Sequence, residues 1–187
     1  MAVKTFTTGE VLTASDTNTY LANAGLVYVT SATIGSGVTF ATVANCFSST
    51  YDNYKIVING GTGSTTDTLH LTLGATTTGY YAGVARVTYD TAANSNLNDN
   101  NAAAWRYFGV IGTTCITMDV DLFDPNATKP TRIHGWWIDP RTGAVAAGAG
   151  GGVLNDTTAY TGFTVTRGTG GTTMTGGTIT VYGYRKA

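Results

Sequence analysis

The chain is poor in charged residues, proline, cysteine and histidine. Only 11% of its 187 residues are charged, and 3 are proline, 2 cysteine and 2 histidine. The 10 Lys and Arg against 11 Asp and Glu leave a net charge of −1, which excludes a protein that binds nucleic acid through a basic surface. No apolar run approaches the roughly 18 residues of a membrane-spanning helix, so no membrane insertion is expected. Residues 1–10 lack the apolar core of a signal peptide, which predicts synthesis in a cytosol.

Threonine and glycine take the place of the missing charges, with 38 and 25 residues. Hydrophobic residues make up 42% of the chain, which excludes a disordered protein. A chain of this length forms one domain whose core needs no disulfide or metal. Cys46 and Cys115 each stand beside an apolar residue, so we interpret them as buried thiols, with a disulfide or redox pair as the alternative.

One helix is predicted near the start of the chain. Residues 13–16 have the pattern of a capping box, in which Thr13 caps the helix and Asp16 lies in its first turn. Tyr20 and Leu21 supply a small apolar patch, and Gly25 is a suitable stop. A helix of about ten residues is marginal alone, so we expect it to dock on another surface.

After residue 25, apolar and polar residues alternate with a period of two, which predicts strands with one buried face. The predicted strands are residues 26–33, 54–59, 69–73, 80–89, 105–111, 116–122, 131–138, 163–166 and 178–182. Turn-forming residues separate them. Many short strands of this kind indicate an all-β domain, an antiparallel β-sandwich of the jelly-roll type, over residues 26–187.

Two segments are predicted to be unusual loops. Residues 90–104 are rich in asparagine, and residues 143–152 consist almost entirely of glycine and alanine. Both are either solvated connections or contact surfaces, because loops on a rigid scaffold often carry binding. The Gly/Ala segment can also allow a neighbouring subunit to approach closely.

Groups suited to catalysis or metal binding are few. Asp119 and Asp121 share a strand face about 6.5 Å apart, within the range for glycosidase carboxylates, but two solvated side chains are the simpler interpretation. Glu10 is the only glutamate, and no nucleophile motif or phosphate-binding loop is present. His70 and His134 are too few for a metal site within one chain, although a trimer axis could gather copies of one of them. We therefore predict no enzyme, no cofactor and no metal.

Aromatic residues carry the stronger signal for binding. Trp136 shares a strand face with Arg132 and His134, whereas Trp137 faces the other way with Ile133. One tryptophan is therefore expected in the core and the other at the surface, where it can stack on a sugar ring or anchor an interface. The predicted outward surface consists of the loops 90–104 and 139–152 with Trp105 or Trp136, and its candidate contacts are Asn96, Asn98, Asn100, Trp105, Trp136 and Arg141.

Three segments resemble structural proteins of tailed bacteriophages, the minor tail or tail-fibre proteins. The first is KTFTTGEVLTASDTNTYL at residues 4–21, continued by GLVYV at 25–29. The others are YDNYKIVI at 51–58 and GTITVYGYR at 177–185. In these proteins, a short arm and helix with the pattern G-E-V-L-T-A-x-x-x-N precede a β domain.

The resemblance implies a virion component, assembled in the cytoplasm of the host bacterium as a homotrimer. Residues 1–25 would attach to other virion proteins through Leu12, Tyr20 and Leu21, and the sandwich would project outward. The first hypothesis is a tail protein that contacts host cell-surface glycans, and the asparagine-rich segment favours it. The alternative is a capsid or tail decoration protein with a purely structural role. The third hypothesis is a depolymerase, and the shortage of carboxylates disfavours it.

Overall fold

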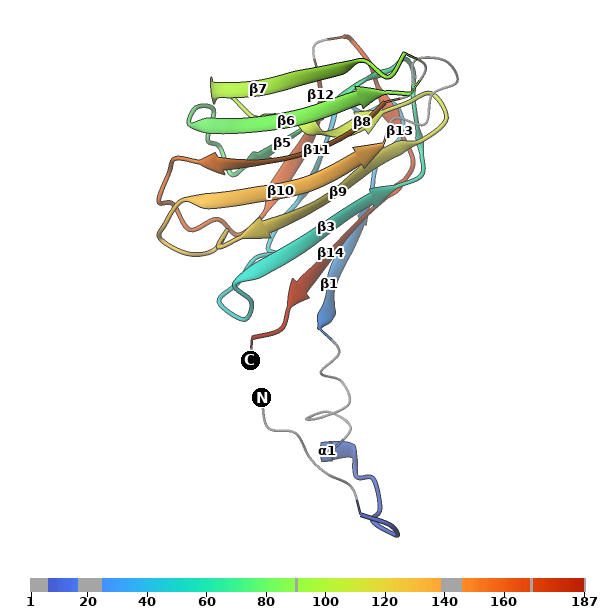
Figure 1. Cartoon of the computed structure of the whole chain (residues 1–187). Helices are drawn as coiled ribbons and strands as arrows, with labels where there is room; N and C mark the ends of the chain where they lie inside the picture. The colour runs from blue at the N-terminus through green and yellow to red at the C-terminus, as the bar shows by residue number, and fades with distance from the viewer. Residues whose placement is uncertain (1–6, 17–24, 90, 139–145, 169, 187) are drawn as a thin grey trace.

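The computed structural model describes residues 7–16, 25–89, 91–138, 146–168 and 170–186 (Figure 1). These residues form fourteen strands and one helix of three residues. The strands of the main sheet pair antiparallel throughout. The predicted all-β antiparallel sandwich is therefore confirmed.

The main sheet has twelve strands that are arranged in two layers. The large layer has the order β1-β14-β3-β9-β10-β11-β6-β7 (Figure 1). Its strands are β1 Leu26–Thr33, β3 Asn53–Asn59, β6 Tyr80–Thr88, β7 Asn94–Ala102, β9 Ile116–Phe123, β10 Thr131–Ile138, β11 Ala146–Leu154 and β14 Thr178–Tyr184.

The smaller layer has the order β2-β12-β5-β8. Its strands are β2 Phe40–Val43, β5 Asp67–Leu73, β8 Trp105–Ile111 and β12 Phe163–Arg167. Strand β8 pairs with β5 and also forms a hairpin with the first residues of β9, which links the layers. A separate pair, β4 Thr62–Gly63 and β13 Met174–Thr175, lies beside this sheet.

The core lies between the layers and is built from alternate residues of the strands. In β9 and β5 the apolar residues of the period-two pattern are buried, as predicted. The largest fully buried side chains include Tyr54, Tyr80, Trp105, Phe108 and Phe163. Burial of an apolar side chain contributes about 1.5–3 kcal/mol, so this interior supplies most of the driving force for folding.

Both segments predicted to be loops contain a strand of the large layer. Strand β7 covers the asparagine-rich segment and pairs with β6, and β11 covers most of the Gly/Ala segment, between β10 and β6. Neither segment alternates apolar with polar residues, so the period-two pattern did not predict a strand in either. The missing side chains of β11 have a packing role: a Cβ on Gly148 would lie 2.6 Å from Nε1 of Trp137, and one on Gly152 would lie 3.0 Å from Nε1 of Trp105.

The turn after β9 is fixed by an ion-paired carboxylate. Asp124 has a positive φ of 62°, and its side chain is only 10% exposed. Its oxygens lie 2.9 Å from Nζ of Lys129 and 2.5 Å from a terminal guanidinium nitrogen of Arg132. Burial alone would raise the pKa of Asp124, but hydrogen bonds from the two cations lower it below its ordinary value.

The capping box predicted for residues 13–16 is confirmed. The Thr13 hydroxyl accepts a hydrogen bond of 3.0 Å from the backbone N–H of Asp16, and the Asp16 carboxylate accepts one of 3.1 Å from the N–H of Thr13. Helix α1, Ala14–Asp16, follows this cap. The rest of the predicted helix, with Tyr20 and Leu21, lies outside the described residues. No helix in the described part of the chain is both long and apolar enough to cross a membrane.

The first and last strands of the sandwich are neighbours in the large layer. Strand β1 pairs with β14 from Leu26 opposite Tyr184 to Thr33 opposite Thr178. The pairing continues past the strands, since the N–H of Arg185 donates to the carbonyl oxygen of Gly25 over 3.0 Å. The start of β1 and the end of β14 therefore lie at the same end of the sandwich (Figure 1).

Candidate functional site: the outer face of the large layer

The candidate site is the outer face of the large layer, the side that points away from the core. Strand β10 shows the division most clearly, because its residues are alternately buried and exposed. Trp136 is 63% exposed on the outer face, whereas Trp137 is 7% exposed and points inward. The prediction that one tryptophan is in the core and the other at the surface is confirmed.

Strand register brings Trp136 and the asparagines to one surface. Trp136 pairs with Ala149 of β11, which pairs with Ala85 of β6, which pairs with Asn96 of β7. Four neighbouring strands at a spacing of about 4.8 Å place the Cα atoms of Trp136 and Asn96 roughly 14 Å apart. Side chains opposite each other in a sheet lie on the same face. Between tryptophan and asparagine the outer face is therefore a floor of small residues.

A second row repeats this arrangement one step along the strands. His134 pairs with Gly151, Gly151 with Gly83, and Gly83 with Asn98. The pairs hold His134 on the tryptophan side and Asn98 on the asparagine side of the same small-residue floor. Two of the predicted contact asparagines and Trp136 thus surround one shallow surface. An aromatic ring with facing amides provides stacking and hydrogen bonding, the two interactions that a sugar ring uses.

On its other side, Trp136 borders a shallow cavity of about 290 Å³. Val57, Thr117, Asp119 and Ile138 are among the residues that line it. Ile138 is 58% exposed, so Trp136 and Ile138 together present apolar surface next to polar groups. Period-two alternation along β10 would have identified Ile138, which our sequence reasoning missed.

Charged residues on this face are paired with one another. Lys55 contacts Asp119 closely, and its Nζ lies 3.9 Å from Asp121. The hydroxyl of Tyr184 donates to Asp121 over 2.5 Å. Burial and then this hydrogen bond raise the pKa of Tyr184 to about 12. The two carboxylates do share a face, as predicted, but they share one lysine and do not flank an open site.

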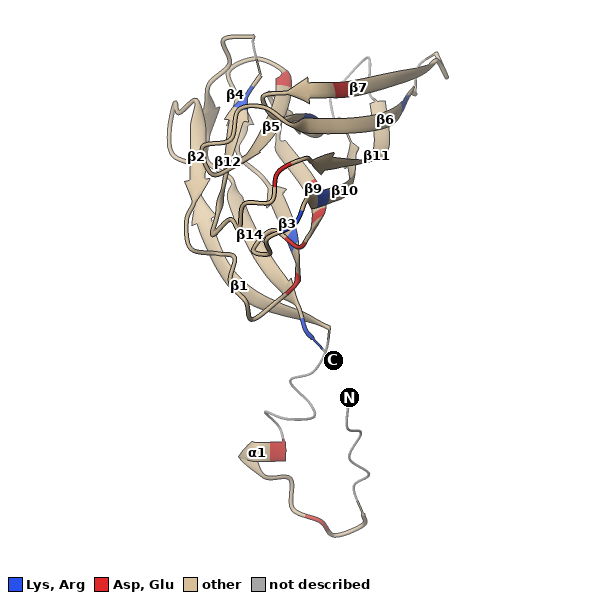
Figure 2. Cartoon of the chain, turned by 90° about the vertical axis from the view of Figure 1, so that its left-hand side faces the viewer, with Lys and Arg blue, Asp and Glu red and all other residues tan. Residues whose placement is uncertain are grey.

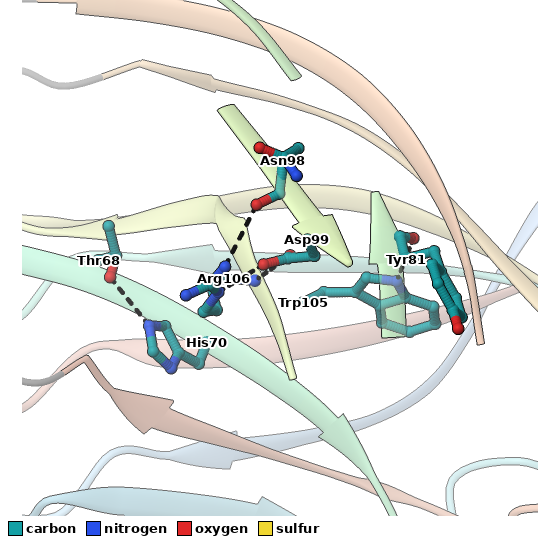
Figure 3. A network of polar contacts seen from close by, with 7 residues as sticks. All are labelled: Thr68, His70, Tyr81, Asn98, Asp99, Trp105 and Arg106. Atoms are coloured by element: carbon teal, nitrogen blue, oxygen red, sulfur yellow. Dashed lines mark hydrogen bonds and ion pairs between the residues drawn. The ribbon is translucent and has the colours of Figure 1, made fainter. Parts of the chain in front are cut away.

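An ion pair on the inner side fixes the asparagine-rich strand (Figure 3). The side chain of Asp99 is completely buried and lies 2.5 Å from Nε of Arg106 on β8. The backbone N–H of Arg106 also donates to Asp99 over 3.0 Å, and its guanidinium donates to the carbonyl oxygen of Asn98 over 3.2 Å. A buried carboxylate with several donors is a strong constraint. These bonds hold β7 against β8 while Asn98 projects outward.

The two histidines lie on different strands and different layers. His70 on β5 is half-buried and its Nε2 lies 3.0 Å from the hydroxyl of Thr68 (Figure 3). Burial lowers the pKa of His70. His134 is exposed on β10. Across the described ranges, no group of three or more His, Cys, Asp or Glu residues could hold a metal ion.

The remaining predicted contacts are Trp105, Asn100 and Arg141. Trp105 is completely buried, so its prediction as a surface contact was wrong: its ring packs on Tyr80 with centroids 5.0 Å apart, and its Nε1 donates to the carbonyl oxygen of Tyr81 over 3.3 Å (Figure 3). Asn100 is exposed, but near the point where the β6–β7 register shifts. Arg141 lies outside the described residues.

Comparisons with protein-family models, curated proteins and solved structures find no match.

Proposed function

We propose that this protein is a structural component of a tailed-bacteriophage virion, a minor tail or tail-fibre protein. Residues 1–25 attach it to other virion proteins, and the outer face of its sandwich contacts the host cell surface. The protein acts as a homotrimer and by binding, without catalysis. Low charge supports a role in a surface assembly: strands β1, β2, β11 and β14 carry no charged residue, and Figure 2 shows long stretches of the ribbon without one.

The observation that carries the proposal is the exposure of apolar side chains on the N-terminal arm. Residues 7–15 are all exposed, and within them Val11 and Leu12 are 78% and 49% exposed. The arm nevertheless has local structure, since Glu10 accepts from the N–H of Thr7 and the capping box holds Thr13 and Asp16. Exposed apolar side chains on a locally ordered segment are suited to burial against a partner.

Deletion of residues 1–25 tests the attachment. We expect the truncated protein to fold, because the core residues all lie beyond the arm, and to be missing from purified virions when it is the only copy supplied. Leu12→Asp should reduce incorporation more than Thr8→Asp, which changes a neighbouring exposed residue. Quantitative immunoblotting of purified particles measures both. Full incorporation of the truncated protein would sink the proposed attachment.

The contact with the host rests on Trp136, Asn96 and Asn98. Trp136→Ala should lower the rate of adsorption to host cells without changing the melting temperature, because the ring is mostly exposed. Phe40→Ala is a matched control, since Phe40 is 58% exposed on β2 of the other layer. Adsorption that is unchanged in Trp136→Ala and in a double variant of the two asparagines would contradict this role.

The alternative is a decoration protein of the capsid or tail with a purely structural role. The low content of charged residues favours it as much as it favours a tail protein. Labelling of the protein in intact virions, followed by electron microscopy, separates the two. Label at the tail tip supports host contact, and label over the head or along the tail supports decoration. Light scattering of the purified protein tests the trimer directly.

A further inference from the structure

A cavity between the two layers is lined by polar residues, and two of them have a buried N–H without a partner in the described part of the chain. It has a volume of about 260 Å³ and lies between β5 and β8 on one side and β6, β7 and β10 on the other. Its lining includes Asp67, Thr68, Arg86, Leu97, Tyr107 and Trp137. All of these except Trp137 are only half-buried, so the cavity is open to solvent at its rim.

Two N–H donors in the wall of this cavity are buried without a partner. Gly148 pairs with Trp137 on one side and with Arg86 on the other, so the three residues form one row on the inner face. Gly148 has no side chain, which leaves room for the indole ring above it. Nε1 of Trp137 and Nε of Arg86 are both buried and have no hydrogen-bond partner. A buried donor without an acceptor is rare in folded proteins.

Arg86 differs from Arg106 and Arg132, which both pair with a carboxylate. Arg106 is paired with Asp99, and Arg132 with Asp124. In the described part of the chain Arg86 forms no ion pair. Nε1 of Trp137 and Nε of Arg86 are closed to an atom the size of a water oxygen, so the wall offers a ligand the terminal nitrogens of the Arg86 guanidinium, which can only donate. Their complement is a carboxylate, which accepts two parallel bonds from a guanidinium.

The remaining lining suits a hydroxylated body attached to that carboxylate. Asp67 accepts from the N–H groups of Thr68 and Gly170 over 2.8 and 3.1 Å, and its remaining lone pairs can accept from hydroxyl groups. The same carboxylate disfavours a compact dianion such as phosphate. The Leu97 side chain and the Trp137 ring provide apolar surface for the faces of a sugar ring.

We propose that this cavity binds a sugar acid, with the carboxylate on the terminal nitrogens of Arg86, the sugar ring beside Trp137 and the hydroxyl groups toward Asp67 and Thr68. The site is separate from the small-residue floor of the outer face. It does not depend on the proposed virion role, because binding is a property of the purified protein.

The test uses the indole N–H signals of the full-length ¹⁵N-labelled protein. Trp137→Phe, which keeps a ring but removes the donor, identifies the Trp137 signal. Titration with sodium galacturonate is expected to shift this signal and leave that of Trp136 unchanged. Galactose, which lacks the carboxylate, and acetate, which lacks the sugar body, should each bind at least about tenfold more weakly, since a charge-assisted bond or a set of hydroxyl contacts is missing.

Arg86→Gln should weaken galacturonate binding by about tenfold or more. It should leave the melting temperature nearly unchanged, because within the described ranges the Arg86 side chain forms no ion pair that the change would remove. Arg167→Gln is the control: Arg167 lies on β12 and does not line the cavity. The proposal fails if galacturonate does not shift the Trp137 signal, if acetate or galactose binds equally well, or if Arg86→Gln binds like the parent. The comparison of the three ligands on the unmodified protein needs no variant to fold.

Discussion

Substitution of Gly150 by alanine would test whether the Gly/Ala segment is a packed central strand. A Cβ atom on Gly150 would lie 2.4 Å from the carbonyl oxygen of Gly83 and 2.9 Å from Cα of Val84. Both are backbone atoms of the neighbouring strand β6, and they cannot move aside as a flexible side chain would. Strands β11 and β6 would have to separate locally, in the middle of the large layer.

Forced overpacking of this kind costs about 1–3 kcal/mol. In a protein of this size each kcal/mol lowers the melting temperature by roughly 2–4 °C, so Gly150→Ala should melt about 2–12 °C lower than the parent. In a flexible loop the same change would be neutral, or would stabilise by restricting the unfolded chain.

The control is the next residue along the same strand. A Cβ atom on Gly151 would point to the outer face and meet only the carbonyl oxygen of Ile133, at 3.4 Å. Gly151→Ala should therefore melt within about 1–2 °C of the parent, since surface changes usually alter stability by less than about 0.5 kcal/mol. Urea unfolding and calorimetry measure both variants. Equal melting temperatures for the two variants would refute the assignment of β11 as a strand with inward and outward faces.

Three further predictions concern the core, an ion pair and the thiols. Trp105→Ala should cost about 3–5 kcal/mol in urea unfolding, whereas Trp136→Ala should cost less than about 0.5 kcal/mol; similar losses would contradict their opposite burial. Because the pKa of Asp124 is lowered on folding, this carboxylate stabilises the protein above its unfolded pKa of about 3.9 and the effect is lost as pH falls through the folded pKa. Asp124→Asn should therefore cost about 1–3 kcal/mol at pH 7, and this cost should shrink as the pH falls below about 3.9; a cost that does not change with pH would count against the ion pair. Burial raises the pKa of Cys46 to about 12, so a thiol reagent at pH 8 should modify half-buried Cys115 first and Cys46 only after unfolding.

The sequence allowed prediction of the elements whose pattern is local. Strands β9 and β5 alternate in sequence, and the capping box of Thr13 and Asp16 spans four residues. Strands β7 and β11 could not be predicted this way. Strand β7 is an asparagine-rich edge strand without an alternating apolar face. Strand β11 is a glycine-rich central strand, and its glycines leave room for aromatic rings from neighbouring strands, which its own sequence does not reveal.

The candidate site shows the same limit. Exposure of Trp136 followed from alternation along one strand, but its position opposite Asn96 depends on the order of four strands, which no local pattern contains. Trp105 was predicted at the surface because it follows a polar segment. Residues of β6 and β11, which are distant in sequence, bury it. The unpaired donors of Arg86 and Trp137 are visible only once register places them in one row.

The pairing of β1 with β14 has a consequence for how the protein is made. Among the described strands, β1 pairs with β14 alone, so β1 has no place in the sheet until nearly the whole domain has left the ribosome. Contacts between residues so distant in sequence make folding slow, in the range of milliseconds to seconds for β-sandwiches. Until β14 arrives, the edge of β3 is also uncovered, and an uncovered edge invites pairing with other chains. The closing of the sandwich and unwanted pairing with other chains therefore compete for the same strand edges during synthesis.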